Sequence, residues 1–315
     1  MKLVVIGGGT GLSAMLTGMK RIKDAEITAI VTVADNGGST GRLRDVYDVP
    51  AVGDIRNVLV AMAGDSQNKL FSELINYRFE GDQDVGGHNL GNLIILALIN
   101  ITGSFMGAVQ AASKVMRVDG NILPSTLEQV TLEAAMTDGE VVTGEAEIPK
   151  AGKRIDHVFY DRDIHAYEPA LQAIREADLI IYGIGSLYTS IIPNLIVDGI
   201  SDAIKSNPCP HIYFCNAMTQ PGETSGMCME DHVRALEKHS YEGAADIVVL
   251  DTTYVPQEIY DRYKAEGSVS VRSKETGHSY KVIERQMIRI DENQMIRHDS
   301  EAVKAVVEEI MNDEV

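Results

Sequence analysis

The sequence contains no tryptophan, and aromatic side chains make up only 5% of its 315 residues. Proteins that bind single-stranded nucleic acid by base stacking usually carry more aromatic side chains. Cationic side chains are scarce as well, since 28 Lys and Arg stand against 46 Asp and Glu, for a net charge of −18. Such a chain repels phosphodiester backbones and anionic lipid headgroups. We therefore expect no nucleic-acid partner and no membrane insertion, whereas a few arginines or helix N-termini still suffice to hold one small phosphate ligand.

Cysteines and long apolar runs are also few. Cys209, Cys215 and Cys228 form no CxxC pair, and an odd number of cysteines is poor material for a disulfide framework. The longest apolar run, residues 93–99, is far shorter than the roughly 20 residues that cross a bilayer. Met1 is not followed by the pattern of a signal peptide. These absences predict a soluble, cytoplasmic protein and leave the oligomeric state open, a homo-oligomer included.

Short apolar runs recur along the chain, at residues 2–6, 26–34, 178–182, 211–214 and 246–251. Each run is rich in β-branched residues, and helix-length segments separate most of them. Buried strands separated by helices are typical of a mostly parallel sheet with helices on both faces. We therefore predict a Rossmann-like three-layer α/β/α fold, in which ligands bind at the carboxyl ends of the strands.

Residues 53–116 follow a helical pattern throughout, which predicts a helical layer. The candidate helix starts in this layer are Asp54, Ser66, His88 and Ser104. A further amphipathic helix is expected at residues 301–311, with Ser300 as its N-cap.

The sequence pattern changes in residues 131–147, where polar and β-branched side chains alternate around an Asp138-Gly139 turn. This pattern predicts a hairpin and hence a small antiparallel β excursion within residues 125–165. The sequence shows no repeat and no low-complexity linker, so we expect a single α/β domain over residues 1–315.

A glycine-rich loop follows the first predicted strand, in the segment KLVVIGGGTGLSAML. It contains the pattern G-x-G-x-x-[GA] between a strand and a helix, which is the context of a nucleotide-binding fold. Glycine lets the backbone approach a phosphate closely, so we predict ligand contacts from Gly8, Gly9, Thr10 and Gly11. The alternative is a tight strand-to-helix turn without a ligand.

The second predicted strand leads to Asp35, which stands about 24 residues after Gly11, where a dinucleotide-binding fold places its ribose-binding acid. Spacing alone thus makes NAD the first ligand hypothesis. The next segment, DNGGSTGRLRD, gathers backbone amides, hydroxyls and guanidinium groups, which all bind phosphate oxygens. We predict an anion-binding loop, with a solvated surface loop as the alternative. Its candidate residues are Asn36, Ser39, Thr40, Arg42 and Arg44.

Two later segments open apolar helices with polar side chains. In VGDIRNVLVAMA, Asp54 is either a site residue or only an N-cap, and a cation in the first helical turn needs a partner. The segment GGHNLGNLIILAL repeats the arrangement. Because helix N-termini bind anions, we add the polar residues of both segments to the candidate binding residues. They are Arg56, Asn57, His88, Asn89 and Asn92.

Two further polar loops follow buried strands. IYGIGSLYTSIIPNLIV is a second candidate phosphate cradle, and FCNAMTQPGETSG supplies another polar loop that includes Glu223. Carboxyl ends of parallel strands meet at one edge of the sheet, so we expect both loops to lie near the glycine loop. Their candidate binding residues are Gly185, Ser186, Thr189, Ser190, Asn194, Asn216, Gln220 and Thr224.

The order of the segments GGGTGLS, ADNGGSTGRLR, GDIRN, GHNLGN, GSLYTSIIPNL and NAMTQPGET closely resembles the YvcK branch of the CofD-like family, formerly UPF0052. The match runs from Lys2 to about Thr253, and residues 252–315 match less well. The resemblance implies a Rossmann-like fold with a nucleotide site at the strand ends. For the YvcK branch it implies a cytoplasmic regulatory factor that binds a UDP-sugar and supports growth on gluconeogenic carbon sources and maintenance of cell shape.

CofD is a 2-phospho-L-lactate transferase, which moves a phospholactyl group from a guanosine diphosphate conjugate to a deazaflavin with a divalent metal. By resemblance, residues 8–11 and 186–194 would hold the nucleotide phosphates, and Asp35 with Asp54 would be the catalytic or Mg²⁺-binding groups. This chain has Asp35-Asn36 where the CofD pattern has two adjacent acids, and losing a carboxylate weakens a Mg²⁺ site. We therefore predict a non-catalytic UDP-sugar-binding factor first, a CofD-like transferase second and an NAD-binding protein third. In the first case Arg42, Arg44 or Arg56 would add diphosphate contacts.

Overall fold

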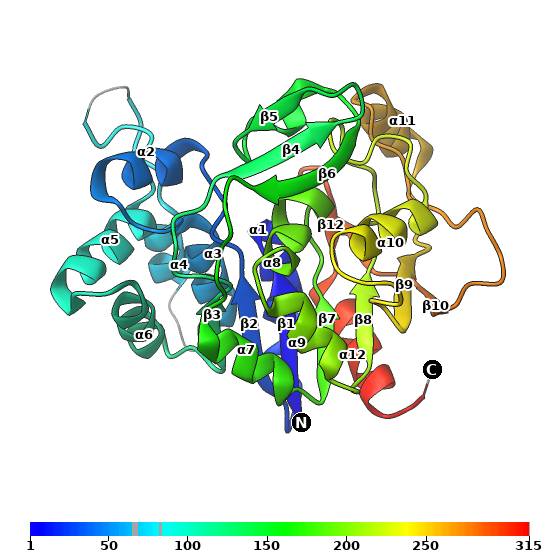
Figure 1. The fold of residues 1–315 in the computed structure, drawn as a ribbon, viewed down its shortest axis with the longest axis horizontal. Helices are drawn as coiled ribbons and strands as arrows, with labels where there is room; N and C mark the ends of the chain where they lie inside the picture. The colour runs from blue at the N-terminus through cyan, green and yellow to red at the C-terminus, as the bar shows by residue number, and fades with distance from the viewer. Residues whose placement is uncertain (65–68, 82–83, 315) are drawn as a thin grey trace.

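The computed structural model describes residues 1–64, 69–81 and 84–314. Its largest sheet has seven parallel strands in the order β10-β9-β8-β7-β1-β2-β3 (Figure 1). These strands are β1 (Lys2–Gly7), β2 (Glu26–Val31), β3 (Asn121–Pro124), β7 (Leu179–Tyr182), β8 (His211–Phe214), β9 (Ile247–Asp251) and β10 (Lys281–Arg285). The strand order runs outward from the middle in both directions, so it reverses between β1 and β7. Such a reversal opens a crevice at the carboxyl ends of the two strands.

The predicted mostly parallel α/β/α fold is confirmed, and all five strands expected from apolar runs are present. Their residues are almost wholly buried because helices cover both faces of the sheet. The edge strands β3 and β10 were not expected. β3 ends in Pro124, and β10 carries Lys281, Glu284 and Arg285. Edge strands tolerate proline and charge, so they lack the apolar run that marks a central strand.

Helices lie on both faces of the sheet (Figure 1). On one face, α1 (Gly9–Met19) packs against α3 (Gly53–Met62) and α12 (Ser300–Met311). The helices on the other face are α7 (Glu168–Arg175), α8 (Ile192–Leu195), α9 (Ile200–Ser206) and α10 (Met229–Lys238). The cap of α12 differs from the expected Ser300. The carboxylate of Asp299 accepts hydrogen bonds from the N–H groups of Glu301 and Ala302, and Ser300 is the first helical residue.

The predicted helical layer lies beside β2 and β3 and consists of α3 with four further helices (Figure 1). They are α2 (Gly38–Tyr47), α4 (Lys69–Asn76), α5 (Leu90–Thr102) and α6 (Phe105–Met116). Ser104 caps α6 as expected, but Asn89 rather than His88 caps α5, and Val52 rather than Asp54 precedes α3. The expected start at Ser66 lies outside the described residues.

No single helix in the described part of the chain has the length and apolar character needed to cross a membrane. By length and composition, α5 and α6 meet that requirement only as a pair. A bend of 117° separates the two helices at Gly103, which adopts the left-handed conformation that ends α5.

The predicted excursion is a small antiparallel sheet that lies across the carboxyl ends of the large sheet (Figure 1). The expected hairpin joins β4 (Leu132–Met136) to β5 (Val141–Thr143), and β6 (Ile155–Tyr160) pairs with the other edge of β4. A short 3-10 turn, Pro149–Ala151, lies between β5 and β6. Asn36 Oδ1 accepts a hydrogen bond from the N–H of Ala146 at 3.0 Å, which ties the small sheet to the loop after β2.

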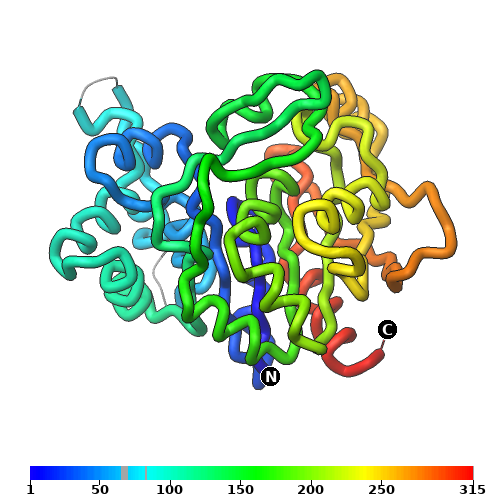
Figure 2. Tube along the Cα trace, viewed as in Figure 1, coloured from blue at the N-terminus to red at the C-terminus, as the bar shows by residue number. Residues whose placement is uncertain are grey.

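The C-terminal part adds α11 (Gln257–Ala265) and a second hairpin, β11 (Ile288–Ile290) with β12 (Ile296–His298). Figure 2 shows this segment, in orange and red, returning to the carboxyl ends of the large sheet before α12 runs back along it. β12 and α12 both contact α1. Thus a segment without recognisable motifs reaches the edge of the sheet at which ligands are expected.

Candidate functional site

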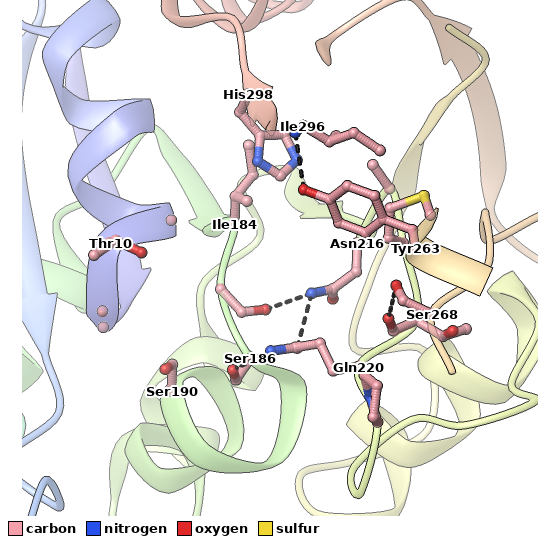
Figure 3. Close-up of a pocket in the computed structure, with 18 of the residues that line it drawn as sticks. Thr10, Ile184, Ser186, Ser190, Asn216, Gln220, Tyr263, Ser268, Ile296 and His298 are labelled. Atoms are coloured by element: carbon pink, nitrogen blue, oxygen red, sulfur yellow. Dashed lines mark hydrogen bonds between the residues drawn. The ribbon is translucent and has the colours of Figure 1, made fainter. Parts of the chain in front are cut away.

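A cavity of about 510 Å³, here called the crevice pocket, lies at the carboxyl ends of β1, β7 and β8 (Figure 3). Its volume is typical of a small-molecule site. The loops after these three strands line it, and the C-terminal segment closes the opposite side. The predicted binding residues that it brings together are Gly8, Gly9, Thr10, Gly11, Gly185, Ser186, Ser190, Asn216 and Gln220.

The glycine loop packs closely against the loop after β7. Gly8 precedes α1 in an extended conformation and provides no side-chain cap, while Gly9 has a φ of +67°. A Cβ atom on Gly11 would lie only 2.5 Å from the carbonyl oxygen of Ile184. Glycine therefore allows the close approach of two loops, and the N-terminus of α1 faces the pocket with no capping side chain at its N-cap position. Such an N-terminus attracts phosphate groups.

Ser186 and Ser190 face the same cavity from the loop after β7. Between them begins a π-helical turn, Leu187–Ile191, in which the N–H of Ile191 donates to the carbonyl of Ser186. Single π turns are frequent at functional sites because they change the direction of side chains within a helix. Ser190 lies opposite the glycine loop, with its Oγ 3.4 Å from the position that a Cβ on Gly9 would take.

The loop after β8 holds the loop after β7 in place (Figure 3). Asn216 Nδ2 donates to the carbonyl of Gly185 at 2.7 Å, and Gln220 Nε2 donates to Ser186 Oγ at 2.7 Å. The hydroxyl of Ser186 is thereby oriented, because its oxygen already accepts one hydrogen bond.

Three predicted binding residues do not line the crevice pocket and support it instead. Thr189 Oγ1 donates to the carboxylate of Glu223 at 3.4 Å. Asn194 is buried and its Nδ2 donates to the carbonyls at the end of β1 and in the π turn. Thr224 Oγ1 accepts from the backbone N–H of Gln220. These contacts fix the positions of the loops that carry the lining residues.

The wall opposite the strand loops comes from the C-terminal segment, and no motif in that segment indicates it. Tyr263 and Ile296 are joined by a hydrogen bond from the N–H of Ile296 to the Tyr263 hydroxyl at 2.9 Å (Figure 3). His298 Nε2 is buried and has no hydrogen-bond partner among the described residues. Burial lowers the pKa of His298 to about 4, so its ring is neutral at physiological pH. Glu266 and Ser268 complete the wall.

Carboxyl groups gather around the glycine loop. Burial, reinforced by the charge of Asp35, raises the pKa of Asp54 to about 7 and that of Glu145 to about 8. Burial also raises the pKa of Glu223 to about 7. Asp54 accepts a hydrogen bond from the N–H of Gly9, and Glu145 reaches the pocket from the small sheet. These acids therefore exchange protons near neutral pH. Glu145 was not predicted, because nothing in its local sequence marks it.

A second cavity, of about 240 Å³, lies beside Asp35 and is here called the arginine pocket. It shares no lining residue with the crevice pocket. It is lined by Asp35, Gly37, Gly38, Ser39, Thr40, Gly53, Arg56, Asn57, Arg78 and Asn92. The predicted candidates are thus not gathered in one cavity, and Arg78 is an addition that the sequence did not indicate.

Polar groups at the start of α5 and just before it hold Ser39 in the first turn of α2. Ser39 Oγ accepts from the N–H of Asn89 and from Asn92 Nδ2, each at 3.2 Å, and lies 3.2 Å from His88 Nδ1. His88 and Asn89 therefore stand behind the arginine pocket and do not line it.

Arg42 and Arg44 use their guanidinium groups to hold backbone. Arg44 donates to the carbonyl of Asp35 at 2.8 Å and to that of Val130, and Arg42 donates to the carbonyl of Gly86 at 2.9 Å. Both arginines, with Asn36, line a third cavity of about 440 Å³. Neither they nor Arg56 line the crevice pocket, so their contact with a diphosphate stays a prediction.

Comparison with known proteins adds the following. The family described as 2-phospho-L-lactate transferase CofD matches residues 3–296. The gluconeogenesis factor of Bacillus subtilis is 44% identical over 315 residues, covering 99% of this chain and 98% of the relative. The gluconeogenesis factor of Halalkalibacterium halodurans is 41% identical over 310 residues, covering 97% and 95%. A crystal structure of a UPF0052 family member from Bacillus halodurans is 40% identical, has a TM-score of 0.91, and covers 97% of this chain and 99% of that one.

Proposed function

We propose that this chain, which belongs to the CofD family, is a non-catalytic regulatory factor. In this proposal it binds a nucleotide sugar of the UDP-sugar class in the crevice pocket. One observation carries the proposal. The N-terminus of α1, whose N-cap residue Gly8 has no side chain, and the hydroxyls of Ser186 and Ser190 line one cavity at the reversal point of the sheet. Relatives bear the name gluconeogenesis factor. The role that we propose is support of growth on gluconeogenic carbon sources and of cell shape, in the cytoplasm.

The two ends of the crevice pocket suit the two parts of such a ligand. The diphosphate would accept hydrogen bonds from the first turn of α1 and from Ser190, as anions do at helix N-termini. In Figure 3 the Tyr263 ring and Ile296 lie away from these hydroxyls, toward the end that the C-terminal segment closes. Flat and apolar groups of this kind suit a nucleoside, and the remaining volume would hold the sugar.

The acids around the pocket make nucleotide binding depend on pH. A diphosphate repels ionised carboxylates, and Asp54, Glu145 and Glu223 have raised pKa values of about 7 to 8. These groups bind protons more readily when a further negative charge arrives, so binding takes up protons. We expect affinity for a nucleotide diphosphate, measured without divalent cations, to fall as the pH rises from about 6.5 to 8.5.

Isothermal titration of the purified protein with UDP-N-acetylglucosamine, NAD and GDP, with and without Mg²⁺ and followed by product analysis, tests the proposal. Ser190→Ala should weaken UDP-N-acetylglucosamine binding about tenfold, because a hydrogen bond to a charged group is worth about 1.5 to 3 kcal/mol. The control is Ser206→Ala, an exposed serine of α9. Equal affinities of both variants and the original protein would remove the π turn from the site. Absence of UDP-sugar binding would refute the proposed function.

The CofD-like transferase is the second candidate, and the neighbouring carboxyl groups of Asp35 and Asp54 favour it. No three His, Cys, Asp or Glu side chains in the described residues are arranged to hold a metal ion. Mg²⁺ commonly uses one or two carboxylates together with substrate phosphates, and Asp35 with Asp54 fits that smaller donor set. When bound, the metal would neutralise phosphate charge. Mg²⁺-dependent GDP binding, turnover of a phospholactyl donor and loss of both in Asp54→Asn would support this candidate over the first.

A further inference from the structure

The arginine pocket gathers cationic groups in a chain of net charge −18. Arg56 and Arg78 line it from α3 and from the segment before α5. No ion pair joins either guanidinium to a carboxylate within residues 1–64, 69–81 and 84–314. Arg56 donates to the amide oxygens of Asn92 at 2.9 Å and Asn57 at 2.5 Å, and Arg78 donates to the carbonyl of Gly87 at 2.7 Å. All these acceptors are neutral, so two positive charges share one cavity without a paired anion.

The surroundings of Arg56 also leave its positive charge incompletely compensated. Its Nε–H is buried and finds no acceptor in the described structure. Burial, followed by the like charge of Arg78, lowers the pKa of Arg56, and the opposing influence of Asp54 and Asp35 comes after both. Holding the partly buried guanidinium of Arg56 beside the like charge of the exposed Arg78 costs free energy unless an anion offsets the repulsion.

Asp35 is an acid that also lines the arginine pocket, but its carboxylate is held by other contacts. Its Oδ1 accepts the N–H of Gly37 at 2.8 Å, so the carboxylate is bound into the turn before α2. No ion pair connects it to Arg56 or Arg78 in the structure as described. The N-termini of α2 and α3 also open here, and neither the Gly37 nor the Val52 N-cap position provides a capping side chain. These helix ends add to the positive potential of the arginines.

We propose that the arginine pocket binds a small anionic group, a phosphate or a carboxylate, as a site separate from the crevice pocket. The volume of about 240 Å³ lies below the usual range for a whole nucleotide and suits one phosphate or a short organic acid. Asn57 also lines this pocket, and its amide can donate to the remaining oxygens. The anion has two possible sources. One is a free metabolite, and the other is an acidic group at the far end of a ligand held in the crevice pocket.

Titration with inorganic phosphate tests the first source. The original protein should bind phosphate, with an affinity that falls as NaCl is raised, because salt screens a partly exposed charge site. Arg78→Gln should weaken binding about tenfold or more, the loss expected for a charge-assisted contact. Arg78 is exposed, so this variant should fold, and Arg56→Gln serves as a second variant once its thermal unfolding matches that of the original. Arg175→Gln, on α7 and far from the pocket, is the charge-matched control.

A pair of matched ligands tests the second source, since UDP-glucuronate differs from UDP-glucose by a carboxylate. A preference of about tenfold for UDP-glucuronate that disappears in Arg78→Gln would assign the pocket to the distal acid of the nucleotide ligand. Phosphate binding that is lost in Arg78→Gln while UDP-glucose affinity is unchanged would assign it to a separate anion. Two results together would overturn the proposal. The first is that phosphate either does not bind or binds all variants equally, and the second is that the protein shows no preference for UDP-glucuronate. Failure to bind either UDP-sugar, with phosphate binding intact, would count against the proposed function alone.

Discussion

Replacing Gly11 by alanine tests whether the close contact between the glycine loop and the loop after β7 holds the candidate site together. In an ordinary helix interior this change stabilises by about 1 kcal/mol, because alanine is the better helix former. Here the new Cβ would lie 2.5 Å from the oxygen of Ile184, 2.8 Å from its carbon and 3.0 Å from Gly185 Cα. All three are backbone atoms and cannot rotate away. An ordinary contact begins at 3.4 Å, so the loops must separate by roughly 0.9 Å (3.4 minus 2.5).

Overpacking of this kind costs about 1 to 3 kcal/mol, and the upper end applies where backbone must move. After the helix-propensity gain is subtracted, Gly11→Ala should lower the free energy of unfolding by about 1 to 2 kcal/mol in urea titrations. It should also weaken UDP-N-acetylglucosamine binding about tenfold, because the α1 N-terminus and Ser190 no longer face one ligand at the same spacing. Gly7→Ala is the control, since its Cβ would meet nothing nearer than 3.7 Å. A Gly11→Ala protein as stable as, or more stable than, the original would refute the reasoning.

The remaining predictions concern buried carboxyl groups. Between about pH 6.5 and 8 the free energy of unfolding should fall, because raised pKa values leave protons on Asp54, Glu145 and Glu223 in the folded state that the unfolded chain has lost. Each group contributes on the order of 1 kcal/mol, so Glu145→Gln should flatten part of the slope in urea titrations, and a profile flat in both proteins contradicts the assignment. Glu230 is buried and accepts hydrogen bonds from Ser273 Oγ at 2.6 Å and from backbone N–H groups of the same loop. Glu230→Gln should therefore cost about 2 kcal/mol of stability at pH 7, and an unchanged urea midpoint would show that this carboxylate does not hold the loop.

Much of the fold follows from local pattern, and the exceptions have a common cause. Central strands such as β1 are buried on both faces, so apolar runs in the sequence predict them. The Asp138-Gly139 turn predicts the hairpin of β4 and β5, and Gly139 adopts a φ of +90° in that turn. The edge strand β3 and the strands β11 and β12 are only three or four residues long and contain no apolar run like that of a central strand. Their pairing depends on where the sheet ends and not on their own residues.

The candidate site divides in the same way. Loops after β1, β7 and β8 were expected to meet because parallel strands bring their carboxyl ends to one edge, and in the structure they line one cavity. The contribution of Tyr263, Ile296 and His298 depends on a chain return of the C-terminal segment, which no spacing in that segment signals. The placement of Asp35 and Arg56 in a different cavity from the glycine loop also depends on tertiary structure. It arises because α2 and α3 open toward a different cavity.

The position of Asn36 in the structure bears on whether the chain could bind a catalytic metal ion. The sequence suggests that an asparagine beside Asp35 leaves a metal site one carboxylate short. Side chains of adjacent residues in an extended segment point to opposite sides. Accordingly Asp35 lines the arginine pocket, whereas Asn36 lines the cavity of Arg42 and Arg44 and accepts the N–H of Ala146. An acid at position 36 with this backbone would hold the small sheet as the amide does, and it would not face Asp54. If the transferase proposal holds, phosphoryl-type chemistry would therefore depend on Asp35, Asp54 and the unpredicted Glu145, whose charges influence one another.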